Sequence, residues 1–420
     1  MKNKMTLTAI SFLANFVMAG FATQFGMLVE PIANAFNANI NEVASIFSLL
    51  NGGALAGTIA AFFLIEKVGI KRMTVLCYGI IALSSLGLYI APSLSIVMLC
   101  MAIIGFCGGV GLCIAGTIVV SLWKDKIQST MLVVQDATFN IAGVVFPMIT
   151  TYALTNAMNW SISYLSVGVV ALATMFIALL TNFNQCGDES ATQTESKSEW
   201  NFGIISGGIG LFLGMLALYT FLTWAPMFVK EKFDIPFEQA GNIITQYWSA
   251  ALVGALVSTV IVSRMKIQYF LLTIITLAMV ITSVIVTTNQ LEWLSYLTYG
   301  YGFACAALYN AFIAYGVSFV RNASSKNVSY ILVSGSAGAM FSPAISSMME
   351  SIVGLQTVMY AIPAIYAVVL VMLIASTKYK VQSKPIQSNS NCINSYRFKR
   401  HRKGLHLCRP LLLRKLSKPF

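Results

Sequence analysis

Charged side chains are scarce in the apolar stretches of this chain, and Asp136 is the one acidic residue that we place clearly inside such a stretch. An ionisable group in lipid is costly unless it faces water or a partner, so Asp136 is a functional candidate by default. A carboxyl that alternates between water and a low-dielectric interior could take up and release a proton. A structural interpretation is also open, because Asp136 lies near one end of its stretch, where it could cap the helix or pair with Lys124 or Lys126.

Neutral polar and aromatic side chains are the second set that could do chemistry. Amides offer hydrogen bonds and aromatic rings offer stacking faces, which suits an uncharged or zwitterionic solute. The candidate solute contacts are Asn15, Gln24, Asn51, Gln135, Asn140, Tyr219, Thr223, Gln246, Tyr301, Tyr309 and Asn310. The same stretches hold no Lys or Arg, which disfavours a strongly anionic solute. For the aromatic residues a place at the membrane interface is an equal alternative, above all for Trp224, Trp248 and Trp293.

Enzymatic and metal chemistry find little support in the sequence. Both histidines, His401 and His406, lie near the C-terminus, and the eight cysteines show no paired spacing. A membrane-embedded enzyme needs a nucleophile with a base, or a set of metal ligands, at one depth. We therefore expect no enzyme activity, no cofactor, no metal site and no disulfide framework.

The composition predicts a chain that needs lipid. Hydrophobic residues make up 57% of the 420 residues and charged residues 10%, which leaves too little polar surface to cover a water-soluble globule. Apolar stretches of about 20 residues recur from end to end, so we expect an all-α membrane protein with about twelve transmembrane helices. The expected spans are 7–29, 43–65, 73–91, 95–122, 131–153, 161–182, 203–226, 240–262, 268–287, 293–320, 328–349 and 356–376. The first is too long for a cleaved signal peptide and is followed by further spans, so we expect it to be retained.

A polar segment at 184–202 divides the apolar body into two six-helix halves, 1–183 and 203–376, and a basic tail at 377–420 follows. We expect the segment to be a cytoplasmic linker and the tail to be disordered in the cytoplasm. The halves resemble each other at an offset of 196 to 197 residues, which indicates an ancestral duplication. The matching pairs are Ala54–Gly57 with Ala251–Gly254, Gly105–Cys107 with Gly302–Ala304, and Asn140–Pro147 with Ser336–Pro343.

The charges predict the orientation. All 14 acidic residues and 14 of the 26 basic residues precede residue 377, so the whole net charge of +12 lies in the tail. Such a tail suits anionic lipid headgroups, and we expect no nucleic-acid partner. With the N-terminus in the cytoplasm, only Lys230 and Lys232 among the basic residues before the tail fall outside, so we expect both termini to be cytoplasmic.

Between the second and third expected spans the chain reads Glu66-Lys67-Val68-Gly69-Ile70-Lys71-Arg72. This run resembles the loop signature of the major facilitator superfamily, in which an aspartate, a basic residue, a glycine and a basic pair follow a leading glycine. Phe62, Glu66 and Ile70 depart from that signature at the leading glycine, the aspartate and one basic position. An acid at a helix end can bridge to basic groups and latch one conformation of a rocking transporter. The resemblance therefore implies a gating loop of Glu66, Lys67, Gly69, Lys71 and Arg72; ordinary placement of basic residues in the cytoplasm is the alternative.

Residues 1–376 as a whole are similar to this superfamily, and the run from Gln135 to Gly143 resembles its sugar-permease-like branch. Ala142-Gly143 followed by Phe146-Pro147-Met148 is similar to a pattern of the TsgA group of bacterial inner-membrane proteins. The resemblance implies the superfamily fold with two pseudo-symmetric halves, and a multi-pass place in a bacterial inner membrane as a monomer.

Together these features favour a secondary active transporter that moves a small polar solute by alternating access. A proton carried by Asp136, as in a symporter, is the candidate coupling ion. Three alternatives stay open: a facilitator without ion coupling, an exporter, and a sensor that descends from a transporter and moves no solute.

Overall fold

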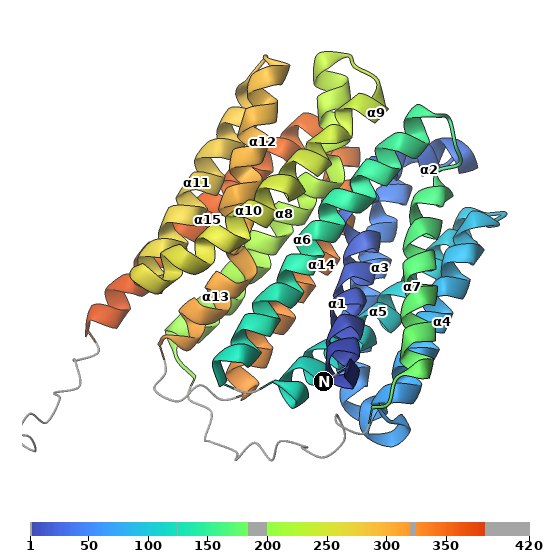
Figure 1. Ribbon diagram of the computed structural model, residues 1–420. Coiled ribbons are helices and arrows are strands. Elements are labelled where there is room, and N and C mark those ends of the chain that lie inside the picture. Colours follow the sequence, from blue (N-terminus) through green and yellow to red (C-terminus); the bar gives the residue numbers. More distant parts are fainter. Residues whose placement is uncertain (1, 124, 184–199, 320–324, 383–420) are drawn as a thin grey trace, which may run out of the picture. The chain divides into compact units, whose positions relative to one another are not determined.

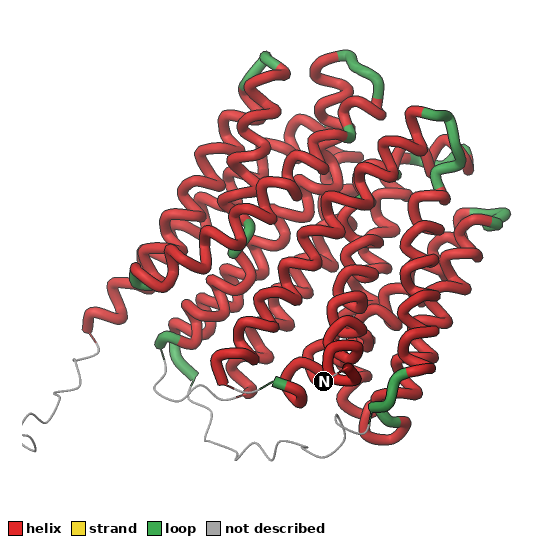
Figure 2. Tube along the Cα trace, in the orientation of Figure 1, coloured by secondary structure: helices red, strands yellow, loops and turns green. Residues whose placement is uncertain are grey.

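The computed structural model describes residues 2–123, 125–183, 200–319 and 325–382, and all regular structure in these residues is helical (Figure 2). The contacts place Met1–Lys380 in one compact unit and Val381–Phe420 in a second, and the fold described here is that of the first. Most of the expected polar linker and most of the expected basic tail lie outside the described residues.

Fifteen α-helices and one short 3-10 helix make up the described chain. Their bounds are α1 Lys2–Thr23, η1 Phe25–Met27, α2 Val29–Phe36, α3 Ile40–Val68, α4 Ile70–Tyr89, α5 Leu94–Leu122, α6 Asp125–Thr155, α7 Ser161–Leu180, α8 Phe202–Phe233, α9 Phe237–Ala240, α10 Asn242–Arg264, α11 Ile267–Thr287, α12 Leu291–Cys305, α13 Leu308–Val317, α14 Ser325–Val353 and α15 Leu355–Gln382.

The long apolar runs explain why these segments are helical, because in lipid every backbone N–H and C=O must be satisfied within its own segment. Eleven segments of the described chain are long and apolar enough to cross a membrane. The tenth expected span, 293–320, is divided into α12, with 15 residues, and α13, with 10. The expected all-α membrane fold is confirmed. Of the twelve expected spans, eleven are matched by helices of membrane-spanning length, and the tenth is matched by two shorter helices that are interrupted at Ala306 and Ala307.

The helices form two halves, α1 to α7 and α8 to α15 (Figure 1). In the first half α3 packs on α5 and α4 on α7, and in the second α8 packs on α14 and α10 on α12. The halves meet along two seams: α3 lies against α14, and α6 lies against α10. Figure 1 shows the N-terminus at one end of this bundle and α2 and α9 at the other, which we call the α2/α9 end.

The close approach of α3 to α5 is repeated by α10 and α12, and glycine makes both possible. A methyl group on Gly105 would lie 2.1 Å from the carbonyl oxygen of Leu50, and one on Gly302 would lie 2.1 Å from the carbonyl oxygen of Tyr247. Small residues let backbones meet in lipid, where apolar burial alone gives no preference for protein over lipid tails. Gly302 and Tyr247 follow Gly105 and Leu50 by the same 197 residues, so the duplication seen in the sequence is a duplication of packing.

We attribute the interruption between α12 and α13 to one side chain. In the first half a methyl group on Gly109 would lie 2.0 Å from the Ala54 carbonyl oxygen, so glycine lets the continuous helix α5 pack closely on α3. The equivalent position in the second half is Ala306, and its methyl carbon would lie 2.9 Å from a methyl group added to Gly254 of α10. A straight helix would drive the Ala306 methyl group into the α10 backbone. The chain instead leaves helical geometry next to it, and Ala307 has φ −106° and ψ 9°.

Candidate functional site

The α3/α14 seam is joined by two hydrogen bonds. Pro343 has no N–H, so the carbonyl of Ala339, one turn earlier in α14, lacks its helical partner. The Asn51 side-chain amide of α3 donates to that carbonyl oxygen at 3.2 Å. Nearby, the Ala344 backbone N–H donates to Ser48 Oγ at 3.0 Å. The proline therefore creates an acceptor that the opposite half uses.

A second proline-freed carbonyl lies where η1 meets α8. Pro226 interrupts the helical bonding of α8 and leaves the Leu222 carbonyl without its helical donor. Gly26 of η1 packs so closely on this carbonyl that a methyl group on Gly26 would lie 2.1 Å from its oxygen. This is a backbone-to-backbone contact between the two halves, and only glycine fits there.

An ion pair reinforces the contact at the α2/α9 end. Lys230 Nζ, near the C-terminus of α8, lies 2.6 Å from Glu30 Oε1 of α2. Thr151 near the end of α6 and Asn242 at the start of α10 also approach each other there, with 3.5 Å between their side-chain oxygens. The α2/α9 end is thus a place where both halves are held together by charge and by polar contacts.

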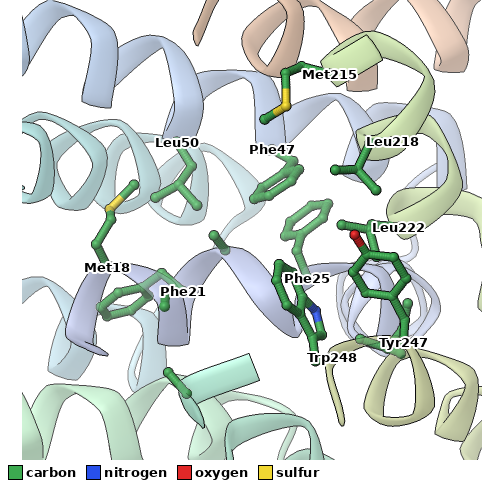
Figure 3. Close-up of a cluster of buried hydrophobic side chains, with 14 of the residues drawn as sticks. Met18, Phe21, Phe25, Phe47, Leu50, Met215, Leu218, Leu222, Tyr247 and Trp248 are labelled. Carbon is green, nitrogen blue, oxygen red and sulfur yellow. The ribbon is translucent and has the colours of Figure 1, made fainter. Parts of the chain in front are cut away.

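Large aromatic side chains fill the space beneath this end, and Figure 3 shows part of the buried cluster. The rings of Phe25 and Phe47 stack with centroids 4.6 Å apart, and Tyr219 of α8 lies 5.8 Å from Phe47. Phe139 of α6 lies 5.6 Å from Trp248 of α10. These pairs bring side chains from both halves to one buried region of aromatic surface.

The expected contacts of the first half lie on the facing helices α1, α3 and α6, and most of them are buried. The Asn15 side-chain amide donates to the Gln135 backbone carbonyl at 2.7 Å, which ties α1 to α6. Gln24, with no exposed surface, follows α1 directly, and its Oε1 accepts a hydrogen bond from Thr150 of α6. Asn140 is half-buried in α6. Asn51 is the expected contact that reaches across to the second half.

The expected solute contacts of the second half do not share one surface, because several of them form hydrogen bonds within that half. Thr223 is buried in α8 and donates to the Tyr219 carbonyl one turn earlier. Tyr301 pairs with Tyr366 of α15, with 2.8 Å between the hydroxyl oxygens, so its polar atom is used inside the second half. Tyr309 donates to the Leu332 carbonyl of α14 at 3.1 Å.

Two amide residues complete the expected set in the second half. Gln246 donates through Nε2 to Ser295 Oγ of α12 at 3.4 Å, a bond within its own half, while its Oε1 is buried without a partner among the described residues. Asn310 is exposed on α13. The expected contacts of the second half are thus dispersed, and Tyr219 is the member whose ring reaches the first half.

The expected gating loop is a single residue long in the structure. α3 ends at Val68, α4 begins at Ile70, and Gly69 between them has φ +88° and ψ 147°. Residues with a side chain rarely adopt this backbone region, which explains the glycine of the signature. Lys67 and Arg72 are exposed beside it; the Glu66 side chain lies outside what the structure describes.

The structure places Asp136 in α6, one residue before the apolar part of that helix, which begins at Ala137. Its side chain also lies outside what the structure describes. Neighbouring positions on α6 show what the helix faces there: Gln135 is buried against α1, and Thr138 donates to the Phe12 carbonyl of α1 at 3.2 Å.

Several buried polar atoms have no hydrogen-bond partner among the described residues, and half of them lie on α1, α6 and α10 or, in the case of Gln24, directly after α1. These are Thr23 Oγ1, Gln24 Nε2, Gln135 Oε1, Thr245 Oγ1, Gln246 Oε1 and Trp248 Nε1. The others are spread over α2, α3, α4, α7 and α11. On α8 and α14, in contrast, Thr220 pairs with Ser342 and Trp224 with Ser346, both at 2.9 Å.

This uneven distribution is what the sequence alone did not reveal. Thr245 and Trp248 were not among the expected solute contacts, and for Trp248 the sequence allowed a place at the membrane interface equally well. The signal that could have found Trp248 is the repeat, because Trp248 occupies the position of Asn51 in the second half.

A set of buried neutral donors and acceptors beside aromatic rings can bind an uncharged polar molecule by hydrogen bonds and stacking. Within the described residues no three His, Cys, Asp or Glu side chains gather as a metal site would require.

The fold and this arrangement define a class: a multi-pass helical membrane transporter with two duplicated halves that meet along two seams. The chain belongs to the Major Facilitator Superfamily, whose family model matches residues 10–327.

Relatives and solved structures agree with this assignment. The chain is 26% identical over 372 residues to a protein TsgA homolog of Edwardsiella ictaluri, covering 88% of this chain and 94% of the relative. It is 24% identical to a TsgA homolog of Yersinia enterocolitica, with the same coverage. Among solved structures it is similar to the nucleoside transporter NupG, with a TM-score of 0.70 and 13% identity over 91% of this chain and 100% of that one. A bacterial homolog of the human lysosomal transporter Spinster, in an inward-facing and unoccupied conformation, gives a TM-score of 0.72 and 14% identity over 92% and 98%.

Proposed function

We propose that this transporter moves a small, uncharged or zwitterionic polar solute by alternating access, and that the solute binds between the halves against α1, α6 and α10. The observation that carries the proposal is the group of six buried polar atoms, on or directly next to these helices, that have no hydrogen-bond partner in the part of the chain that the structure describes. Leaving a buried donor or acceptor unpaired costs about 1–3 kcal/mol. A solute that supplies hydrogen bonds would recover that free energy when it binds.

The chemistry of the group supports a neutral or zwitterionic solute. The six atoms belong to amide, hydroxyl and indole groups, which can make hydrogen bonds but carry no net charge. A strongly anionic solute normally meets a fixed positive charge, and the expected spans hold no Lys or Arg. The stacked pair Phe25 and Phe47 adds an apolar face.

We propose further that the described conformation faces the cytoplasm, in a bacterial inner membrane with both termini inside. With that orientation the α2/α9 end is external. The Glu30–Lys230 ion pair and the contact of Gly26 with the Leu222 carbonyl support closure of that end. Alternating access then requires these contacts to separate when the solute enters from outside.

Reconstitution tests the proposal without a prior choice of solute. Proteoliposomes are incubated with a polar extract of uniformly isotope-labelled bacterial cells, and the labelled molecules inside are identified by mass spectrometry. We expect at least one neutral or zwitterionic solute to accumulate beyond its level in protein-free vesicles. If no labelled solute enters, with or without an imposed pH gradient, the transport proposal fails and the sensor interpretation gains support.

Proton coupling through Asp136 is the finer part of the proposal. A carboxyl next to the apolar part of α6 could exchange a proton with either side as the halves rock. Asp136→Asn should abolish the dependence of uptake on a pH gradient while uptake down the solute gradient continues. Asp125→Asn, the same substitution in the first turn of the same helix, is the matched control and should keep the gradient dependence. Unchanged gradient dependence in Asp136→Asn would remove Asp136 from coupling, and no gradient dependence in the unmodified protein would favour a facilitator.

A further inference from the structure

The two seams between the halves are equivalent under the internal repeat, which allows them to be compared position by position. The 197-residue offset that relates Leu50 to Tyr247 also relates Ser48 to Thr245 and Asn51 to Trp248. On the opposing helices an offset of 196 residues relates Pro147 of α6 to Pro343 of α14. By the same offset Gly143 corresponds to Ala339. The α6/α10 seam therefore presents the same positions as the α3/α14 seam with different residues.

In the α3/α14 seam both positions are used to join the halves. Asn51 donates to the Ala339 carbonyl that Pro343 leaves free, at 3.2 Å, and Ser48 accepts from the Ala344 N–H at 3.0 Å. Each polar group on α3 is thus satisfied by the opposite half. In this seam, therefore, the side chains at positions 48 and 51 hydrogen-bond to the opposite half of the protein itself.

In the α6/α10 seam the corresponding groups have no such partner. Trp248 is 7% exposed, and its Nε1 is buried without a hydrogen-bond partner among the described residues. Thr245 Oγ1, one turn earlier on α10, is also buried without a hydrogen-bond partner among the described residues. Pro147 cannot donate a helical bond to the Gly143 carbonyl. The Trp248 ring lies against Gly143, because a methyl group on Gly143 would lie 2.6 Å from two of its ring carbons.

We propose that Trp248 and Thr245 bind the transported solute, and that they are specificity-determining residues of the α6/α10 seam. This assignment rests on the proposed function. An indole N–H is a donor only, so it requires a hydrogen-bond acceptor on the solute, such as a carbonyl or hydroxyl oxygen. A threonine hydroxyl both donates and accepts, so it suits a solute hydroxyl or carbonyl beside that acceptor. The solute class is a neutral molecule with hydroxyl or carbonyl oxygens and an apolar face that packs on the rings of Trp248 and Phe139.

The test separates binding from structure by comparing two tryptophans. Trp248→Phe removes the indole N–H and keeps an aromatic ring. Trp224→Phe makes the same change in α8, where the N–H donates to Ser346 Oγ at 2.9 Å inside one half. Uptake from the labelled polar extract is measured at several dilutions of the extract, and thermal unfolding of each purified variant is measured without solute.

We expect Trp248→Phe to raise the solute concentration for half-maximal uptake about tenfold, because one hydrogen bond to the solute is lost. Its maximal rate should stay within about twofold of the unmodified protein's. Thr245→Val should raise the half-maximal concentration as well, and Thr245→Ser, which keeps the hydroxyl, should restore it. Trp224→Phe should leave that concentration unchanged but unfold at a lower temperature than Trp248→Phe, since it alone loses a bond within the protein.

Two results would overturn the assignment while leaving transport intact: an unchanged half-maximal concentration in both Trp248→Phe and Thr245→Val, or a Trp248→Phe protein that unfolds at as low a temperature as Trp224→Phe. The second would mean that the Trp248 N–H is satisfied inside the protein. Failure of the unmodified protein to accumulate any labelled solute would overturn the proposed function and this assignment together.

Discussion

Replacement of Gly105 by alanine tests whether the α3 and α5 backbones touch as the structure describes. The added methyl group would lie 2.1 Å from the Leu50 carbonyl oxygen, whereas an ordinary contact begins at 3.4 Å. The obstacle is backbone, so no side-chain rotation relieves it, and the two helices must move apart by more than 1 Å. Forced overpacking of this kind typically costs about 1–3 kcal/mol. The gap that opens along the helix pair adds the loss of dispersion contacts on both sides.

Gly116→Ala is the matched control because Gly116 lies in the same helix and a methyl group there would meet nothing within 4 Å. Alanine is the better helix former by about 1 kcal/mol, so Gly116→Ala should leave stability unchanged or raise it. Gly302→Ala should behave like Gly105→Ala, since its methyl group would lie 2.1 Å from the Tyr247 carbonyl oxygen. Thermal unfolding in detergent, followed by size-exclusion elution after heating, ranks the variants.

The expected order of unfolding temperatures is Gly116→Ala at or above the unmodified protein, and both Gly105→Ala and Gly302→Ala well below it. Equal unfolding temperatures for Gly105→Ala and Gly116→Ala would refute the close contact. A loss in Gly105→Ala without a loss in Gly302→Ala would refute the equivalence of packing in the two halves.

Three other changes have defined outcomes. Gly69→Ala should lower the free energy of unfolding by about 1–3 kcal/mol from backbone strain alone, since the residue has φ +88° and a methyl group there would meet nothing within 4 Å; thermal unfolding beside Gly116→Ala measures it. Lys230→Met should loosen the α2/α9 end, because it removes the partner of Glu30. In a background without native cysteines, a membrane-impermeant maleimide should then label a buried Thr223→Cys reporter faster. The charge exchange Glu30→Lys with Lys230→Glu should restore slow labelling. Ala306→Gly should let α12 and α13 join, which would slow hydrogen exchange of the backbone amides at 306–308, whereas unchanged exchange would show that the methyl group is not the cause of the break.

The sequence predicted the architecture well because the relevant signals are long. Eleven of the expected spans were found as continuous apolar helices, and the loop glycine, Gly69, lies where the resemblance to the superfamily put it. Such features depend on composition over about 20 residues or on a change that only glycine permits. Neither requires knowledge of which side of a helix faces its neighbours.

Side-chain partners were predicted less well for a physical reason. In a membrane protein the lipid-facing and protein-facing sides of a helix are both apolar, so periodicity does not fix the rotation of the helix. Tyr301 was an expected solute contact, yet its hydroxyl pairs with Tyr366 inside the second half. The sequence allowed a place at the membrane interface equally well for Trp248, yet this residue is buried against Gly143 of the opposite half. One-dimensional pattern could not distinguish these cases.

The internal repeat supplies the rotational information that periodicity lacks, because it transfers a contact seen in one half to a definite position in the other. Where both copies carry glycine, as at Gly105 and Gly302, the packing is reproduced. Where one copy carries a methyl group, as at Ala306 in the position equivalent to Gly109, the helix is interrupted. At a third pair of equivalent positions the side chains differ in chemistry. The Asn51 amide donates to the opposite half and closes the α3/α14 seam, whereas the Trp248 indole N–H has no partner among the described residues and is left to bind a solute in the α6/α10 seam. The asymmetry between the halves is therefore concentrated at positions where a duplicated backbone carries unlike side chains, and those positions are the ones at which a duplicated scaffold can acquire a single binding site.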